Sequence, residues 1–185
     1  MIGNDLVYLP DWGKFSAERK KSFRAKLFTG EEQSSLAKFS NQPDAEALLW
    51  SMKEAAYKLY FRVFPVPFYL PKKFECHLYH WCEKEVSGRV AFGKHEFLTQ
   101  SLFTEDYLHT IALEAAALHG FDEVQKLIKA YHKNQPRLIE DARHSEKLKV
   151  EKDENGIPQL LLENKPVPHS VSVSHDGDKI AFAWV

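Results

Sequence analysis

Alternating apolar and polar positions predict strands at both ends of the chain. Residues 2–9, IGNDLVYL, form an apolar run that Asn4 and Asp5 interrupt, and the run predicts a buried strand carrying one carboxylate. Residues 171–185, VSVSHDGDKIAFAWV, place apolar side chains at alternate positions on both sides of an Asp-Gly-Asp turn. This pattern is typical of two short strands joined in a hairpin.

Helices are predicted between the first strand and the middle of the chain. The segments 15–28 and 30–40 favour helices, and the second begins after Thr29, whose hydroxyl can cap a first turn that contains two glutamates. From about Asp44 to Val63, apolar residues recur at spacings of three and four, which predicts the clearest helix of the chain.

Strands predominate after a cluster of prolines that ends this helix. They are expected at about 73–82, 86–92, 96–102 and 107–115. One further helix is expected at 121–133, and a pair of strands about the Asn155-Gly156 turn precedes the final hairpin. Because helices come early and strands later, the predicted fold class is α+β, with helices packed on antiparallel sheets.

Composition limits the kinds of protein that this chain can be. With 185 residues, 44 % hydrophobic and 28 % charged, it can bury a core as one domain or two small ones. A net charge of −1 argues against a protein built around nucleic acid. The N-terminus lacks a signal-peptide pattern, and no run approaches the roughly 20 apolar residues of a membrane span. We therefore expect a cytoplasmic protein with no membrane segment.

Positive charge is concentrated in one segment. Residues 14–28 contain six basic residues and one acidic residue, although the whole chain is nearly neutral. Such a segment can attract an acidic partner, and it can equally be the solvated face of a helix.

The two cysteines lie in CHLYHWC, where regular strand alternation would put Cys76, His80 and Cys82 on one face. That arrangement would suit a soft metal, but the spacing matches no common zinc motif and aromatic residues surround the pair. We therefore expect ordinary packed cysteines in a reducing compartment.

Ser174, His175 and Asp176 stand side by side, and these residue types together perform acyl transfer in many hydrolases. In a strand, successive side chains point to opposite faces, so His175 cannot lie between its two neighbours as a proton relay. The triad interpretation is therefore rejected. Asp176 and Asp178 are expected only to shape the turn.

The helix segment WSMKEAAYKLY, residues 50–60, places Glu54 and Lys58 on one face, with Lys53 and Tyr57 on adjoining faces. Taken alone, this pair is an ordinary surface ion pair of a few tenths of a kcal/mol. Asp5 in its apolar strand needs a partner, and a metal ion is one candidate.

Five motifs, taken in order, resemble those of the 4'-phosphopantetheinyl transferase superfamily, in the order of the small holo-acyl-carrier-protein synthases. They are Gly3 and Asp5; Phe23, Lys26, Thr29 and Glu32; Lys53, Glu54, Ala55 and Lys58; Asn155, Gly156 and Pro158; and Ser172, Ser174 and His175. The resemblance implies Mg²⁺-dependent transfer of the 4'-phosphopantetheine arm of coenzyme A to a serine of an acyl or peptidyl carrier protein, releasing adenosine 3',5'-bisphosphate. The pathway, in fatty-acid or secondary-metabolite synthesis, stays open.

The same resemblance assigns roles to individual residues. Asp5 and Glu54 would hold Mg²⁺, an ion that keeps positions for water and for the coenzyme A pyrophosphate. Glu54 and Lys58 would be catalytic: Lys58 meets the pyrophosphate, and Glu54 takes the serine proton directly or through metal-bound water. The expected contacts with coenzyme A are Lys53, Lys58, Ser174, His175, Gly156 and Pro158. The expected contacts with the carrier protein are Arg19, Lys20, Arg24 and Lys26.

Two departures from the family pattern leave alternatives open. Val7 and Tyr8 stand where related enzymes usually have a further glutamate, so a non-catalytic relative that binds carrier protein or coenzyme A is the rival hypothesis. An unrelated P-loop phosphotransferase is disfavoured because the chain lacks G-x-x-x-x-G-K-[ST].

The second departure is the length of the segment 63–151, far more than a small synthase needs. Within it, the stretches FECHLYHW, GRVAFG and EDYLHTIALEAA resemble the strands that close the second half of the larger, pseudodimeric members. We therefore expect 1–117 to form a transferase half with the metal strand and the K-E-A helix. Residues 118–185 would form a shortened second half with the N-G-x-P turn and the hairpin. Such a compact pseudo-dimer would be a monomer, whereas the small synthases imply a homo-oligomer such as a trimer.

Overall fold

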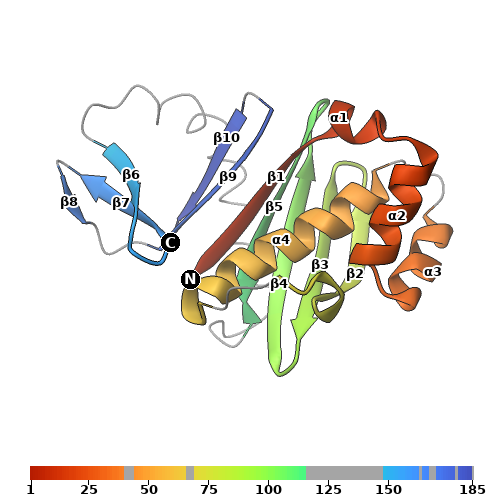
Figure 1. The fold of residues 1–185 in the computed structure, drawn as a ribbon, viewed down its shortest axis with the longest axis horizontal. Helices are drawn as coiled ribbons and strands as arrows, with labels where there is room; N and C mark the ends of the chain where they lie inside the picture. Colours follow the sequence, from red (N-terminus) through yellow and green to blue (C-terminus); the bar gives the residue numbers. More distant parts are fainter. Residues whose placement is uncertain are drawn as a thin grey trace.

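A five-stranded antiparallel sheet with one long helix across it carries the main core (Figure 1). The computed structural model describes residues 1–39, 44–65, 69–115, 148–162, 164–166, 170–177 and 179–184. The sheet has the order β1-β5-β4-β3-β2. Its strands are β1 (Ile2–Tyr8), β2 (Glu75–Cys82), β3 (Glu85–Phe92), β4 (His95–Phe103) and β5 (Tyr107–Glu114).

The helices predicted between the first strand and the cluster of prolines are confirmed. They are α2 (Ala17–Leu27), α3 (Gly30–Lys38) and α4 (Ala45–Val63), and α4 lies along the sheet while α2 and α3 cover one end (Figure 1). A short helix, α1 (Leu9–Gly13), was not expected; it begins where Pro10, whose ring favours the first turn of a helix, follows β1. A single 3₁₀ turn, η1 (Pro71–Lys73), precedes β2.

The C-terminal part of the chain adds two small antiparallel sheets. One contains β6 (Leu148–Lys152), β7 (Pro158–Leu162) and β8 (Lys165–Pro166), and the other is the predicted hairpin of β9 (Val171–Asp176) and β10 (Lys179–Trp184). In Figure 1, β9 and β10 run beside β1. The α+β class is therefore confirmed, the division into halves at residue 117 stays a prediction, and the helix expected at 121–133 lies outside the described residues.

The Asn-Gly turn between β6 and β7 is held by its own backbone and side chains. Gly156 has a φ of 78°, a left-handed conformation that glycine adopts without strain. The Asp153 carboxylate accepts hydrogen bonds from the amides of Asn155, at 2.9 Å, and Ile157, at 2.8 Å. This side-chain-closed turn fixes the positions of Gly156 and Pro158.

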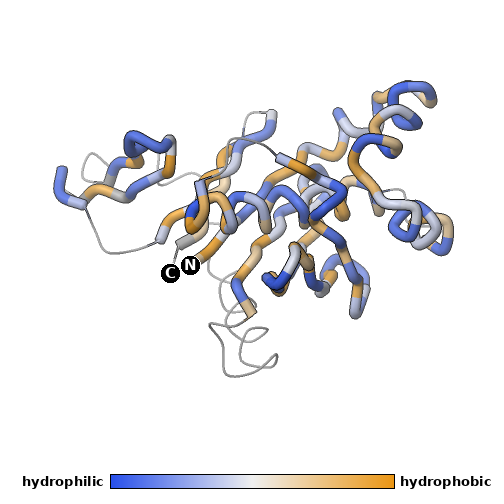
Figure 2. The backbone as a smooth tube through the Cα atoms, turned by 60° about the horizontal axis from the view of Figure 1, so that its bottom comes forward, coloured by the Kyte–Doolittle hydropathy of each residue, from blue (hydrophilic) through white to orange (hydrophobic). Residues whose placement is uncertain are grey.

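The core lies between α4 and the sheet. Along α4, Leu48, Met52, Ala55 and Leu59 follow one face at the predicted spacing and are buried. They pack against apolar strand residues that include Val86, Val90, Phe97, Leu108 and Ala112. Figure 2 shows the corresponding alternation of hydrophobic and hydrophilic positions along the elements. Among the described residues, no helix is long and apolar enough to cross a membrane.

Gly3 sets the distance between β1 and α4. A Cβ atom at this position would lie 2.1 Å from the carbonyl oxygen of Ala55 and 2.9 Å from the amide nitrogen of Leu59. Both are backbone atoms of α4, so a side chain at residue 3 would force the helix and strand apart. The missing side chain therefore brings Asp5 close to the turn of α4 that carries Glu54 and Lys58.

We predict that Gly3→Ala destabilises the protein by about 2 kcal/mol, because the added methyl group overpacks a contact between two backbones. The matched control is Gly30→Ala, at a helix position where a Cβ atom meets nothing within 4 Å. Thermal and urea denaturation of both variants measures the effect. Equal stability of the two variants would show that β1 and α4 are not held at this distance.

Candidate active site

Asp5 lies where β1, α4 and β9 meet, and only 6 % of it is exposed. Its Oδ1 atom accepts hydrogen bonds from Lys58 Nζ, at 2.9 Å, and from Ser174 Oγ, at 3.1 Å. Lys58 Nζ also donates to Ser174 Oγ at 2.9 Å. The second carboxylate oxygen, Oδ2, is buried and has no hydrogen-bond partner within the described part of the chain.

Glu54 precedes Lys58 by one turn of α4, as the motif predicts. Burial raises the pKa of Glu54 to about 7, and the negative charge of Asp5 adds to this increase, while Lys58 opposes it. Burial also raises the pKa of Asp5, against the opposing effects of Lys58 and Ser174. The two carboxylates thus carry an electrostatic penalty that a bound cation would relieve.

Two cavities adjoin at Asp5. The basic cavity, of about 330 Å³, is lined by Asp5, Tyr57, Lys58, Phe61, Arg62, Lys152, Gly156, Ile157, Pro158, Ser172, Val173, Ser174 and His175. The aromatic cavity, of about 500 Å³, is lined by Asp5, Leu6, Val7, Tyr8, Asp11, Trp12, Phe15, Phe23, Trp50, Glu54, His175 and Asp176. Asp5 and His175 line both cavities. Most of the predicted site residues, from three distant segments, therefore surround adjoining spaces.

The donor set at this place fits a hard cation such as Mg²⁺. Asp5 and Glu54 supply carboxylate oxygens, which Mg²⁺ prefers as ligands. The Oδ2 atom of Asp5, which has no hydrogen-bond partner within the described part of the chain, could coordinate the ion. Across the described segments, no cluster of three or more His, Cys, Asp or Glu side chains could hold a metal ion. Val7, at the position of the missing acidic residue, is buried in the hydrophobic core. Protein ligands would therefore number two.

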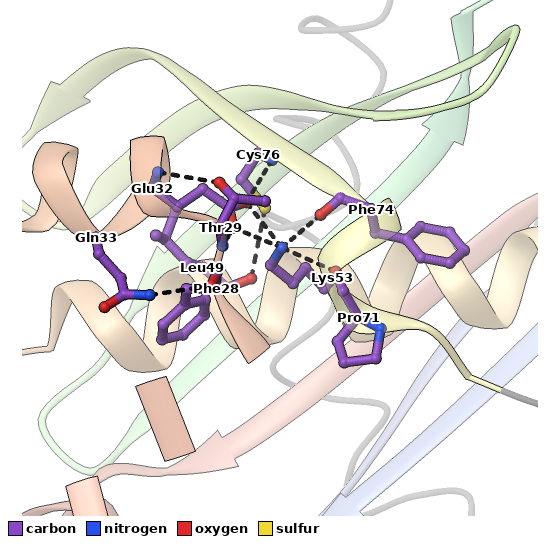
Figure 3. Close-up of polar contacts among 9 residues, drawn as sticks. All are labelled: Phe28, Thr29, Glu32, Gln33, Leu49, Lys53, Pro71, Phe74 and Cys76. Carbon is purple, nitrogen blue, oxygen red and sulfur yellow. Dashed lines mark hydrogen bonds and ion pairs between the residues drawn. The ribbon is translucent and has the colours of Figure 1, made fainter. Parts of the chain in front are cut away.

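Lys53 does not lie in either cavity, contrary to its expected contact with coenzyme A. Its side chain is 0 % exposed, and Nζ forms an ion pair with Glu32 at 2.7 Å (Figure 3). The same nitrogen donates to the carbonyl oxygens of Pro71 and Phe74. All three N–H donors of Lys53 therefore bond protein atoms. The structure gives Lys53 a structural role in place of the expected contact with coenzyme A.

Glu32, the ion-pair partner of Lys53, is a residue of the family motif to which the sequence analysis assigned no role. Its carboxylate accepts a hydrogen bond from the amide of Thr29, at 2.8 Å, and the Thr29 hydroxyl accepts one from the Glu32 amide, which completes a capping box at α3. It also accepts a hydrogen bond from the amide of Cys76, at 2.8 Å. The T-x-x-E spacing is the signal for the cap, but nothing in the sequence indicates the bond to Lys53.

The cysteine prediction is partly wrong. A β-bulge between Leu78 and His80 shifts the register of β2, so the strict alternation that put both cysteines on one face is broken. Cys76 packs against the core, and burial raises the pKa of its thiol. Cys82 is an exposed free cysteine.

Two basic residues of the basic cavity were not expected. Arg62 follows Lys58 by four positions and so lies on the same side of α4, a spacing that could have indicated it. Its guanidinium donates to the carbonyl oxygens of Pro158, at 3.3 Å, and Val171, and so ties β7 and β9 to α4. Lys152 reaches the cavity from the end of β6, which no sequence pattern indicated.

The basic helix α2 presents much of its charge outward, and its role in partner binding stays a prediction. Arg19 and Lys26 are exposed, and the Arg19 guanidinium lies 4.0 Å from the centre of the Phe15 ring. Lys20 is partly buried, and Arg24 forms an ion pair with Glu46 of α4.

The side chains of the SHD sequence separate as expected for a strand. Ser174 is buried and bonded to Asp5 and Lys58, whereas His175 is exposed at the cavities. Asp176 does more than shape the turn, contrary to expectation. One carboxylate oxygen accepts from the Gly177 amide, and the other accepts from the Tyr8 amide at 2.7 Å.

We predict that Lys53→Met lowers the stability of the protein by roughly 3 kcal/mol, because it leaves the buried Glu32 carboxylate without its ion-pair partner. Lys94→Met, at an exposed turn, should change stability little. Chemical denaturation compares the two. Unchanged stability combined with weaker binding of coenzyme A would restore Lys53 as a ligand-binding residue.

Comparison with known proteins gives one family. No curated protein and no solved structure matches the chain significantly. The family model of the 4'-phosphopantetheinyl transferase superfamily matches residues 1–112, which include Asp5, Glu54 and Lys58. This match covers more than half of the chain, and it agrees with the motifs and with the α+β fold built on an antiparallel sheet. The chain therefore belongs to the 4'-phosphopantetheinyl transferase superfamily.

Proposed function

We propose that the protein transfers 4'-phosphopantetheine from coenzyme A to a serine of an acyl or peptidyl carrier protein. The observation that carries this proposal is the meeting of Asp5, Glu54, Lys58 and His175 at two adjoining cavities. These residues come from β1, α4 and β9, and the match to the family model ends before β9 begins. The hairpin therefore adds support that is independent of the family model.

In the proposed reaction, the serine oxygen attacks the phosphorus atom that bears the pantetheine arm. A new phosphorus–oxygen bond forms, the bond to the bridging oxygen of the pyrophosphate breaks, and adenosine 3',5'-bisphosphate leaves with that oxygen. Mg²⁺ held by Asp5 and Glu54 would supply charge neutralisation at the pyrophosphate. Lys58, which is 29 % exposed at the cavity, adds a fixed positive charge on the same side.

The basic cavity suits the nucleotide end of coenzyme A. Lys58, Arg62 and Lys152 contribute positive charge to its lining, where Asp5 is the carboxylate that they face. Gly156 and Pro158 form one wall, which Arg62 holds against α4. We assign His175 to a phosphate of the same ligand, because it is exposed and lines both this cavity and the aromatic cavity.

Glu54 is our candidate for the group that accepts the serine proton. It lines the aromatic cavity among Trp12, Phe15, Phe23 and Trp50, where its carboxylate can accept a proton directly or through metal-bound water. The cavity lies next to α2, from which Phe23 comes. We therefore place the carrier serine in the aromatic cavity and the carrier protein against the basic residues of α2.

We predict that Glu54→Gln lowers the rate of transfer by roughly 100-fold or more, because the amide keeps the shape of the side chain but cannot accept a proton. Asp5→Asn should cause a comparable loss. Intact mass of an apo carrier protein incubated with coenzyme A and Mg²⁺ measures the reaction. Glu31→Gln, on the exposed side of α3, is the matched control. Full activity of Glu54→Gln would refute the mechanism.

The rival function is that of a non-catalytic relative that binds carrier protein or coenzyme A. The buried Val7 in place of an acidic residue is the observation that favours it. The same mass measurement separates the two functions. Binding of coenzyme A without any mass gain, over a panel of acyl and peptidyl carriers, would support the binding module.

We predict that Arg19→Glu and Lys26→Glu raise the KM for an acidic carrier protein about tenfold or more and leave the KM for coenzyme A unchanged, because like charges repel across the interface. Lys94→Glu, in the turn between β3 and β4, is the control for the change in net charge. Steady-state kinetics at low and high salt measures both constants. An equal effect of the control variant would rule out α2 as a specific docking site.

A further inference from the structure

The backbone amides on the edge of β1 that faces away from β5 are bonded by side chains instead of by a neighbouring strand's backbone. β1 pairs with β5 along its whole length. In an antiparallel pair, alternate residues direct their backbone groups to the partner strand. The remaining amides of β1 point away from β5, and they would be buried without partners if the hairpin supplied none.

Four side chains of the hairpin segment accept these amide hydrogens. Ile2, Asn4, Leu6 and Tyr8 donate, in order, to Ser170 Oγ at 3.4 Å, Ser172 Oγ at 3.0 Å, Ser174 Oγ at 3.0 Å and Asp176 Oδ2 at 2.7 Å. Every bond joins residues separated by 168 positions. The two segments therefore run parallel in a single register, joined by side chains where a sheet would use backbone groups. We name these four acceptors the side-chain ladder.

The middle of the hairpin face that carries the ladder is made of small residues. Ser172 pairs with Ala183 and Ser174 with Ala181, and cross-strand partners lie on the same face. All four residues are almost completely buried. A short side chain is needed here because a serine oxygen reaches the β1 amide only when the strands approach closely.

Serines alone do not define one register. Because they occur at every second position, a slip by two residues, about 7 Å along the strand, would bring serine hydroxyls opposite two of the same amides again. One rung differs from the serines: Asp176, whose carboxylate bonds the Tyr8 amide. Asn4 Nδ2 also donates to the carbonyl oxygen of Ala181 at 3.1 Å, but equivalent backbone carbonyls recur at every second residue of a strand.

We propose that the side-chain ladder positions His175, and that Asp176 sets its register. In the observed register, His175 lines both the basic and the aromatic cavity, as Asp5 does. Ser172 and Asp176 are thus positioning residues, which act through the placement of the hairpin. The role of His175 in transfer rests on the proposed function, whereas the ladder itself does not.

The test compares Asp176→Ala, which removes the acceptor, with Asp176→Asn, which keeps a carbonyl oxygen of the same reach. Amide hydrogen exchange followed by NMR is the first measurement. In Asp176→Ala, we expect the Tyr8 amide to exchange about tenfold faster or more, because it loses its hydrogen bond. Asp176→Asn should restore slow exchange. The amides of Gly3, Asp5 and Val7, which face β5, are an internal control for general unfolding.

The second measurement follows the His175 ring by NMR. Its resonances should shift in Asp176→Ala and return in Asp176→Asn, and transfer activity should fall and recover in parallel. Unchanged exchange at Tyr8 would overturn the ladder. Faster exchange with unchanged His175 resonances would overturn its positioning role. Both results are obtained even if the wild-type protein transfers nothing, an outcome that would refute the proposed function only.

Ser172→Ala provides a second variant if Asp176→Ala fails to fold. It removes a middle rung, whose hydroxyl accepts the Asn4 amide hydrogen, and leaves Ser174, the partner of Asp5 and Lys58, in place. The Asn4 amide should then exchange faster, while the amides that face β5 keep their protection. Protection of Asn4 equal to that in the wild type would overturn the ladder at this rung.

Discussion

The position of β1 between α4 and the C-terminal hairpin is the constraint on which the rest of the structure depends. On one side, the missing side chain of Gly3 lets the backbone of α4 approach. On the other, hydroxyl and carboxylate groups of the hairpin bond the amides that β5 leaves free. Asp5 can contact Lys58 and Ser174 together only because both approaches are close. A larger residue on either side would separate the carboxylate from one of its partners.

Helix α4 carries two lysines with opposite uses, and the difference follows from how completely each is neutralised. Lys53 is wholly buried, and its ammonium group is bonded by Glu32 and by the carbonyl oxygens of Pro71 and Phe74, so its charge is confined to holding α3, α4 and the segment before β2 together. Lys58 faces a cavity and shares Asp5 with Ser174. Its charge therefore remains available to an anionic ligand, as the catalytic role that we propose for Lys58 requires.

The sequence predicted the elements better than their contacts. Periodicity located α2, α3, α4 and the strands of the main sheet, but not α1 or the short strand β8. The motifs brought together Asp5, Glu54, Lys58 and His175, which line the two adjoining cavities. Alternation failed at the bulge of β2, because one inserted residue reverses the faces beyond it. The burial of Lys53 was missed because its partner Glu32 lies 21 residues away. Long-range partners of this kind leave no local pattern.

The absent third acidic residue limits how a cation could be held. Besides Asp5 and Glu54, the carboxylates that line the aromatic cavity are Asp11 and Asp176. Asp176 uses both oxygens on backbone amides, and Asp11 is exposed and forms an ion pair with Lys14 at 2.7 Å. Neither carboxylate is therefore free to replace the acidic residue whose position Val7 occupies. In the proposed function, the remaining ligands of Mg²⁺ must then come from water and the pyrophosphate, so the affinity for the ion should depend on the presence of coenzyme A.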